Sequence, residues 1–227
     1  MSEAPLHNPE ADEALLLTQL LCTRLCHDLA GPVGAVAAGV ELAGDDPTQV
    51  DAETLGLIGS SSAAATRKLR FLRAALGVPS GGPSALAGLQ ALVEGYLEAT
   101  AGRDGAPEVR WPSPDALSAV AQQLGSAAAP LVLNLCLLVV EALPSCGVLE
   151  LSVALRPVLQ LSVQGHNAAQ RPVVWRPDVV DALASKPGAP LTAKTIQPYL
   201  ARRLAERSGG RLTLTATPPV LAAVFEV

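Results

Sequence analysis

The sequence predicts an α+β protein in which an N-terminal helical hairpin precedes a two-layer α/β unit. In residues 11–76, apolar side chains recur every three or four positions, a spacing typical of helices. From residue 84 onward, shorter helical stretches separate segments in which apolar and polar residues alternate, as they do in strands. Val78–Pro83 lies between the two patterns and has the composition of a linker. We therefore expect two domains, residues 1–78 and 84–227.

The first long helix is expected over residues 11–43. Its apolar stripe comprises Cys22, Leu25, Cys26, Leu29, Val33, Val36 and Val40. Pro32 falls inside this helix, and because a proline removes one backbone hydrogen bond of the helix, we expect a kink there. Residues 44–47 have the composition of a turn and end the helix.

The second long helix is expected over residues 51–76. Its inner face is formed by Leu55, Ile58, Ala65, Leu69, Leu72 and Leu76. Two long helices joined by a short loop form an antiparallel hairpin. Because two helices alone cannot bury both of their apolar stripes, we expect two copies to associate into a dimeric four-helix bundle.

The α/β unit is expected to contain about three helices packed on a mostly antiparallel sheet of about five strands. The helical stretches are residues 84–101, 114–124, 127–143, 177–185 and 194–208. The strands are expected at residues 108–111, 148–154, 158–164, 211–217 and 220–227. Gly209 and Gly210 follow the last helix and suit its C-terminal cap.

The composition of the 227 residues argues against several classes of protein. Hydrophobic residues make up 49% and charged residues 16%, which is not the composition of a disordered chain. The formal net charge of -5 argues against binding to a nucleic-acid backbone, so we expect no nucleic-acid partner. Only three histidines are present, His7, His27 and His166, and this scarcity limits the available chemistry.

The longest apolar run, residues 130–143, is about 14 residues long, whereas a membrane-spanning helix needs roughly 20. We interpret it as a buried core helix and expect no membrane partner. Residues 1–13 lack the basic start of a secretion signal. The cysteines are Cys22, Cys26, Cys136 and Cys146. Their spacing is not that of a zinc site, so we expect reduced, buried thiols, no bound metal and a cytoplasmic location.

His27 lies two residues from both Leu25 and Leu29, about 200° around the helix from each. It is therefore expected to point away from the apolar stripe, toward solvent. Asp28 follows directly, and such an acid can order the imidazole tautomer or accept its proton. From these residues alone, an ordinary exposed histidine remains the alternative interpretation.

Residues 26–42, CHDLAGPVGAVAAGVEL, resemble the H-box of two-component histidine kinases, and more closely the corresponding segment of ChpT-type histidine phosphotransferases. Residues 134–153 are similar to that family's version of the kinase N-box helix and the strand after it. Residues 191–212 are similar to its late helix and double glycine. The resemblance spans nearly the whole chain and implies that His27 is a phosphoacceptor, with Asp28 as its catalytic neighbour.

The resemblance also implies that the α/β unit is a degenerate histidine-kinase ATPase domain. Asn134 is present on the N-box helix, but Leu138 stands where a second Asn belongs; in an alternative register Glu141 replaces the key Asn. Residues 164–167, QGHN, occupy the place of the adenine-binding Asp. No Gly-rich phosphate loop precedes residue 194. We therefore expect no ATP-dependent kinase activity.

The partners follow from the same resemblance. The implied phosphoryl donor is the receiver domain of a hybrid histidine kinase, and the implied acceptors are response regulators, CtrA-like ones among them, in cell-cycle regulation. Mg²⁺ is expected on the partner receiver, so the chain needs no cofactor of its own. A non-catalytic dimeric adaptor that binds receivers is the alternative function.

The expected partner-contact residues surround His27. Arg24 lies one helical turn before it and is the expected neighbour of the phosphate. Gly31, Pro32 and Ala35 are expected to contact the receiver, because small side chains allow a close approach. Gly31 and Ala35 are equally suited to tight packing within the bundle. A basic cluster on the second helix, Arg67, Lys68, Arg70 and Arg73, suits docking to the acidic pocket of a receiver, but a charge run of this kind is more often an ordinary solvated face, and both interpretations stay open.

Overall fold

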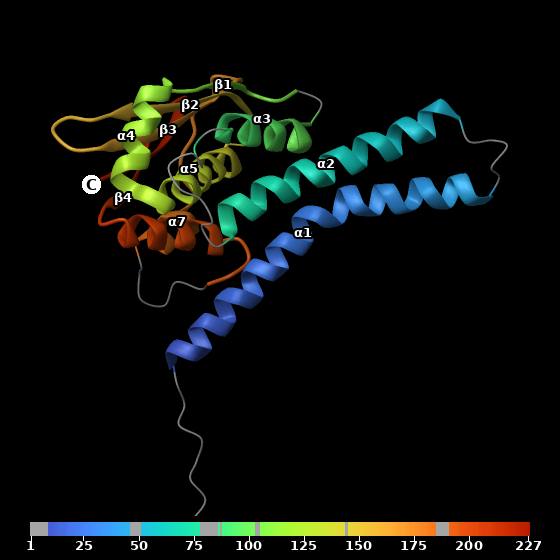
Figure 1. Cartoon of the computed structure of the whole chain (residues 1–227), viewed down its shortest axis with the longest axis horizontal. Helices are drawn as coiled ribbons and strands as arrows, with labels where there is room; N and C mark the ends of the chain where they lie inside the picture. The colour runs from blue at the N-terminus through green and yellow to red at the C-terminus, as the bar shows by residue number, and fades with distance from the viewer. Residues whose placement is uncertain are drawn as a thin grey trace, which may run out of the picture.

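The computed structural model describes residues 9–45, 51–77, 86, 88–102, 105–143, 145–184 and 191–227. The elements are α1 (Pro9–Asp45), α2 (Ala52–Leu76), α3 (Leu89–Thr100), β1 (Glu108–Arg110), α4 (Pro114–Leu124), the 3₁₀ helix η2 (Gly125–Ala127), α5 (Ala128–Ala142), β2 (Cys146–Ala154), β3 (Gln160–Asn167), α6 (Pro177–Leu183), α7 (Ile196–Arg207), β4 (Arg211–Thr217) and β5 (Val220–Glu226) (Figure 1). The fold class predicted from the sequence, a helical hairpin followed by an α/β unit, is confirmed.

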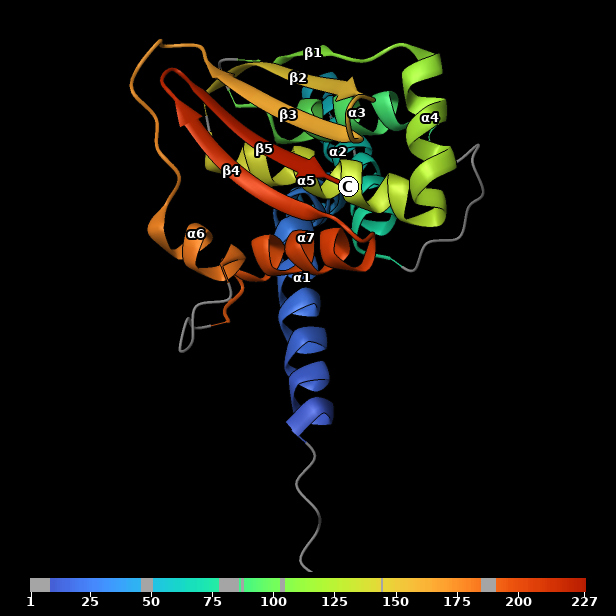
Figure 2. The ribbon, with the colours of Figure 1, turned by 90° about the vertical axis from the view of Figure 1, so that its left-hand side faces the viewer.

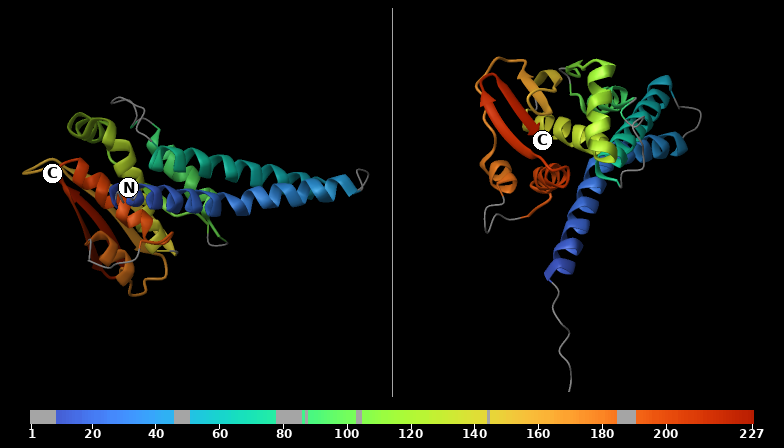
Figure 3. Two further views of the ribbon diagram at one scale, coloured as in Figure 1. Left: turned by 90° about the horizontal axis from the view of Figure 1, so that it is seen from below. Right: turned by 60° about the vertical axis from the view of Figure 1, so that its left-hand side comes forward.

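α1 and α2 form an antiparallel hairpin that projects from the α/β unit (Figures 1 and 3). α1 runs through Pro32 without interruption, and Figure 1 shows it bending along its length. Asp51 caps the start of α2 by accepting a hydrogen bond from the Thr54 backbone nitrogen. The two helices approach closely at Gly39, where an added Cβ would lie 2.5 Å from Cγ1 of Ile58. α1 continues through Gly44 and Asp45, the first half of the predicted turn, and the second half, residues 46–47, lies outside the described residues.

The sheet has five strands in the order β1-β2-β3-β5-β4, and all pairs are antiparallel except β1 with β2. β2 begins at Cys146, two residues earlier than expected, because a β-bulge between Cys146 and Val148 lets the strand continue pairing up to Asn167. β3 therefore also ends later than expected. α4, α5 and α7 contact the sheet, which agrees with the prediction of about three helices. Figure 2 shows α5 behind the sheet and α7 alongside β4.

α5 is the centre of the core. Its residues from Ala128 to Val139 are buried apart from Ala129. The run from Pro114 to Ala142 is long and apolar enough for a membrane span by composition, but 67% of its most apolar window is buried in the protein, as expected of a core helix. Phe71 of α2 belongs to the same core cluster, so the base of the hairpin is packed into the α/β unit. The predicted linker 78–83 lies outside the described residues, and the division into two domains stays a prediction.

The cysteines divide into two pairs. Cys136 is buried and Cys146 is half-buried, whereas Cys22 and Cys26 are exposed. The prediction of buried thiols is therefore wrong for Cys22 and Cys26 in the single chain. The reason is that both lie on the stripe of α1 that α2 leaves uncovered.

Burial raises the pKa of Cys136 to about 12, that of Cys146 to about 11 and that of Tyr96 to about 12. Each of these groups loses its proton at a lower pH in the unfolded chain than in the folded chain. Their contribution to stability is therefore complete below the pKa values of the unfolded chain, and it is lost as the pH rises toward the pKa values of the folded chain. The free energy of unfolding should fall by about 1.4 kcal/mol per pH unit for each group ionised only in the unfolded chain. Urea unfolding between about pH 8 and about pH 11 measures this slope. Cys136→Ala should make it shallower; an unchanged slope would contradict the assignment.

Candidate functional site

His27 lies on α1 with 87% of its side chain exposed, as the sequence predicts. Its Nδ1 lies 3.3 Å from Oδ1 of Asp28. Because a neutral imidazole carries one proton, this contact favours the proton on Nδ1 and leaves the lone pair of Nε2 to react with a partner. The exposed ring is thus arranged as a nucleophile on the surface of the hairpin.

Three further residues, from α1, α2 and α3, surround the acid beside this histidine. Oδ2 of Asp28 lies 3.7 Å from Nε of Arg24, one turn earlier on α1. Lys68 of α2 lies 3.4 Å from the backbone oxygen of Asp28 and donates to it. Tyr96 of α3 is near enough for the Asp28 charge to contribute to its raised pKa, after the larger effect of burial. This contact of Lys68 was not expected from the sequence, where the residue is one member of a basic cluster on the second helix.

Arg24 is buried, with 8% of its side chain exposed. Its Nη2 donates to Oε1 of Glu141 near the end of α5, so α1 is tied to the α/β unit. Burial lowers the pKa of Arg24, and the charge of Asp28 opposes that shift. A direct contact between Arg24 and a phosphate on His27, as expected from the sequence, would require the guanidinium to leave both carboxylates.

The expected receiver-contact residues lie C-terminal to His27 on α1. Gly31 is exposed, and a Cβ placed on it would meet nothing within 4 Å, so packing within the single chain does not require a glycine there. Pro32 and Ala35 are half-buried. Contact of these three residues with a receiver stays a prediction.

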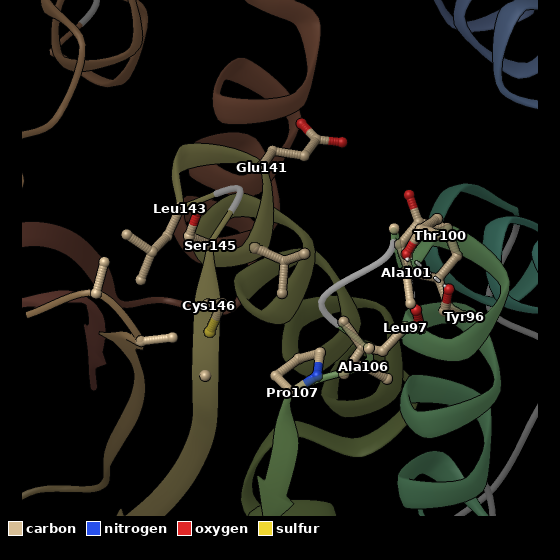
Figure 4. A pocket seen from close by; sticks show the side chains of 16 residues that line it. Tyr96, Leu97, Thr100, Ala101, Ala106, Pro107, Glu141, Leu143, Ser145 and Cys146 are labelled. Carbon is tan, nitrogen blue, oxygen red and sulfur yellow. Dashed lines mark hydrogen bonds between the residues drawn. The ribbon is translucent and has the colours of Figure 1, made fainter.

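A pocket of about 770 Å³ opens on the other side of Glu141 (Figure 4). Tyr96 and Thr100 stand at one side, Glu141 lies at the rim, and Cys146 is on β2. The Tyr96 ring stacks on Phe71 with centroids 4.2 Å apart. This pocket therefore shares two walls, Tyr96 and Glu141, with the cluster around Asp28.

Asn134 of the resembling N-box helix is fully buried and fully used in internal hydrogen bonds. Its Nδ2 donates to the backbone oxygens of Ala75 at 2.6 Å and Pro130 at 2.8 Å. Its Oδ1 accepts from Nε2 of Gln197 at 2.9 Å. Leu138, where a second Asn was considered, is 3% exposed. Asn134 thus joins α2, α5 and α7, a role signalled in the sequence only by a lone amide in an apolar helix.

Metal-ligating side chains do not gather in the part of the chain that the structure describes. No group of three or more His, Cys, Asp or Glu residues there has the arrangement to hold a metal ion. The chemistry of the site as described consists of one exposed imidazole, one anchored carboxylate and the buried cation behind it.

The structure combines an exposed histidine and an adjacent acid on a helical hairpin with an α/β unit packed against the base of the hairpin. This is the architecture expected of a histidine phosphotransfer protein, and the comparisons with known proteins point to the same class. Residues 87–219 match the model of the histidine phosphotransferase C-terminal domain. The chain is 31% identical over 216 residues to protein phosphotransferase ChpT of Brucella abortus (strain 2308), which covers 92% of this chain and 94% of the relative. The chain belongs to the histidine phosphotransferase family, and the resemblance stated from the sequence is confirmed.

A solved structure described as a bacterial phosphotransferase superposes with a TM-score of 0.73 at 25% identity, covering 94% of this chain and 97% of the other. The histidine kinase AdeS of Acinetobacter baumannii is matched at a lower level, with a TM-score of 0.43 at 11% identity over 88% of this chain and 96% of the other.

Proposed function

We propose that the chain is a cytoplasmic phosphorelay protein that carries a phosphoryl group on His27 between receiver-domain aspartates, without using ATP. The observation that carries the proposal is the exposed imidazole of His27 with Nδ1 at Asp28. Family membership supports it, because a histidine phosphotransferase needs one accessible histidine.

The transfer step follows from this geometry. The lone pair of His27 Nε2 attacks the phosphorus of a receiver phospho-aspartate, the bond between phosphorus and the aspartate oxygen breaks, and the carboxylate leaves with the electron pair. Asp28 stabilises the positive charge that develops on the ring while Nδ1 keeps its proton. The reverse step passes the phosphoryl group to a second receiver aspartate.

The proposed donor is the receiver domain of a hybrid histidine kinase, and the proposed acceptors are response regulators, including CtrA-like regulators of the cell cycle. Mg²⁺ is placed on the receiver, where it neutralises charge on the transferring group. Gly31, Pro32 and Ala35 are the proposed contact surface, since they lie on α1 within two or three turns of His27.

The test is incubation of the chain with phosphorylated receivers in the absence of ATP. Label should move from a receiver to the chain and then to a second, unphosphorylated receiver. Receiver binding without label on the chain would instead indicate the adaptor function. Self-labelling from ATP would indicate a kinase and overturn the proposal.

We also propose that the chain forms a homodimer through the hairpin. The outward stripe leaves large apolar side chains exposed on both helices, among them Val33, Val40, Leu55 and Leu69. A groove of about 300 Å³ lined chiefly by apolar side chains, including Leu21, Leu25 and Leu72, lies at the base of the hairpin. A second hairpin on this face would bury the stripe and complete a four-helix bundle.

Val40→Glu should convert the dimer into a monomer, because a two-fold interface would bury the introduced charge twice without a partner. The dissociation constant of the dimer should rise roughly 100-fold or more. Analytical ultracentrifugation measures it. Leu42→Glu is the matched control, since Leu42 is 65% exposed and lies about 200° around α1 from Val40. Equal effects of both variants would contradict the proposed interface.

A further inference from the structure

A continuous chain of charged groups links the α/β unit to the reactive histidine. Arg24 lies between two carboxylates: its Nη2 donates to Glu141 of α5, and its Nε lies 3.7 Å from Oδ2 of Asp28. The other oxygen of Asp28, Oδ1, lies 3.3 Å from Nδ1 of His27. The contact sequence therefore runs from α5 through α1 to the imidazole ring.

Arg24 is held more firmly than the other residues in this series of charged groups. Only 8% of its side chain is exposed, and a buried guanidinium depends on its ionic partners because leaving them unpaired is costly. Glu141 is 37% exposed, yet it belongs to α5, the most deeply buried helix of the core. The position of the guanidinium is therefore set by a rigid element of the α/β unit.

Asp28 depends on this anchor for its orientation. Its side chain is 21% exposed, and its Oδ2 is buried without a hydrogen-bond partner, so the charge of Arg24 is what draws that oxygen inward. With Oδ2 turned toward Arg24, Oδ1 faces the ring of His27. A carboxylate placed in this way selects the tautomer of its histidine.

We propose that Arg24 and Glu141 are positioning residues for phosphotransfer: Glu141 orients Arg24, Arg24 orients Asp28, and Asp28 keeps the proton of His27 on Nδ1 so that Nε2 is the nucleophile. The α/β unit thereby contributes to the reaction although its own side chains do not touch the transferred group. This role of Arg24 and Glu141 in transfer rests on the proposed function, whereas their effect on the tautomer does not.

The first readout is the ¹⁵N chemical shift of the His27 ring in the full chain, measured without any receiver. The wild-type ring should be mainly in the Nδ1–H form. Arg24→Met and Glu141→Gln should raise the population of the Nε2–H form. Glu98→Gln is the matched control, because Glu98 pairs with Arg67 at 3.4 Å on an exposed surface between α3 and α2 and does not take part in the contacts that join Glu141, Arg24, Asp28 and His27.

The second readout is the rate of transfer from a phosphorylated receiver. Arg24→Met and Glu141→Gln should lower the rate constant about 10- to 100-fold, the effect known for losing the partner that orients a metal-binding histidine, with little change in receiver affinity. Glu98→Gln should change it less than about 2-fold. Should Arg24→Met fail to fold, Glu141→Gln, at a partly exposed position, carries the test.

The outcomes separate the two proposals. Tautomer populations that are unchanged in both variants would overturn the positioning role, whatever the transfer rates. A tautomer shift in a chain that accepts no phosphoryl group would support the positioning of Asp28 and overturn the phosphorelay function. A tautomer shift together with slower transfer supports both.

Discussion

Replacement of His27 by alanine should reduce phosphoryl transfer from a receiver to background. The imidazole is the nucleophile of the proposed step, and without it no covalent intermediate forms, so the loss should exceed about 10³-fold. The fold should be unaffected, because the side chain is 87% exposed and, among the described residues, its polar contact is with its neighbour on the same helix, Asp28. The free energy of unfolding should change by less than about 0.5 kcal/mol.

His166→Ala is the control for this experiment. His166 lies on β3 in the α/β unit, paired with Val148 of β2, and takes no part in the proposed step. This variant should accept label as the wild type does. Undiminished labelling of the His27→Ala variant, or its loss only in His166→Ala, would exclude His27 as the carrier.

The second large effect is expected for stability. Asn134→Leu should lower the free energy of unfolding by about 2–4 kcal/mol, because the fully buried Gln197 amide keeps only the Asn134 backbone oxygen of its two acceptors and the Ala75 carbonyl loses a donor. These hydrogen bonds connect α7 and α2 through α5. Urea unfolding measures the change.

Gln160→Leu is the matched control for Asn134→Leu. It also removes a side-chain amide hydrogen bond, from Gln160 to Glu226 at 2.6 Å, but at an exposed site. Water replaces that bond when it is lost, so a change below about 1 kcal/mol is expected. Similar changes for both variants would mean that the buried network does not hold the hairpin to the α/β unit.

The hydrogen bonds of Asn134 explain why an asparagine on the helix that resembles the kinase N-box does not serve an ATP site here. In a kinase the corresponding residue is expected to face Mg²⁺, but here both amide hydrogens and the side-chain oxygen have partners inside the protein. A metal ligand at this position would have to break hydrogen bonds that join three helices. The residue that suggests an ATP site in the sequence is thus a structural link in the fold.

The spacing of apolar residues in the sequence was sufficient to predict the helices and strands, but not the contacts between them. The apolar spacing in α1 and α2 and the alternation in β2 to β5 are properties of short segments, and they located these elements to within a few residues. The exposure of His27 followed from its angle on the helix. By contrast, Arg24 and Glu141 are separated by 117 positions, and no local signal in the sequence joins them.

The same limit explains the error concerning the cysteines and why the ionic partner of Arg24 was not foreseen. Arg24 is one turn from His27, which suggested a phosphate contact, but the fold places a carboxylate from α5 against it. Cys22 and Cys26 lie on an apolar stripe, which suggested burial, but within the described residues of a single chain both remain exposed. In both cases the missing information is which distant surface, or which second copy, faces the residue.

The most direct measurement of the central claim is the location of the phosphoryl group by mass spectrometry, after incubation with a phosphorylated receiver and under alkaline conditions that preserve phosphohistidine. We expect the modification on the peptide that contains His27, at Nε2, and its disappearance when an unphosphorylated receiver is added. An unmodified His27 in a chain that binds the receiver, or a phosphoryl group on another residue, would contradict the claim.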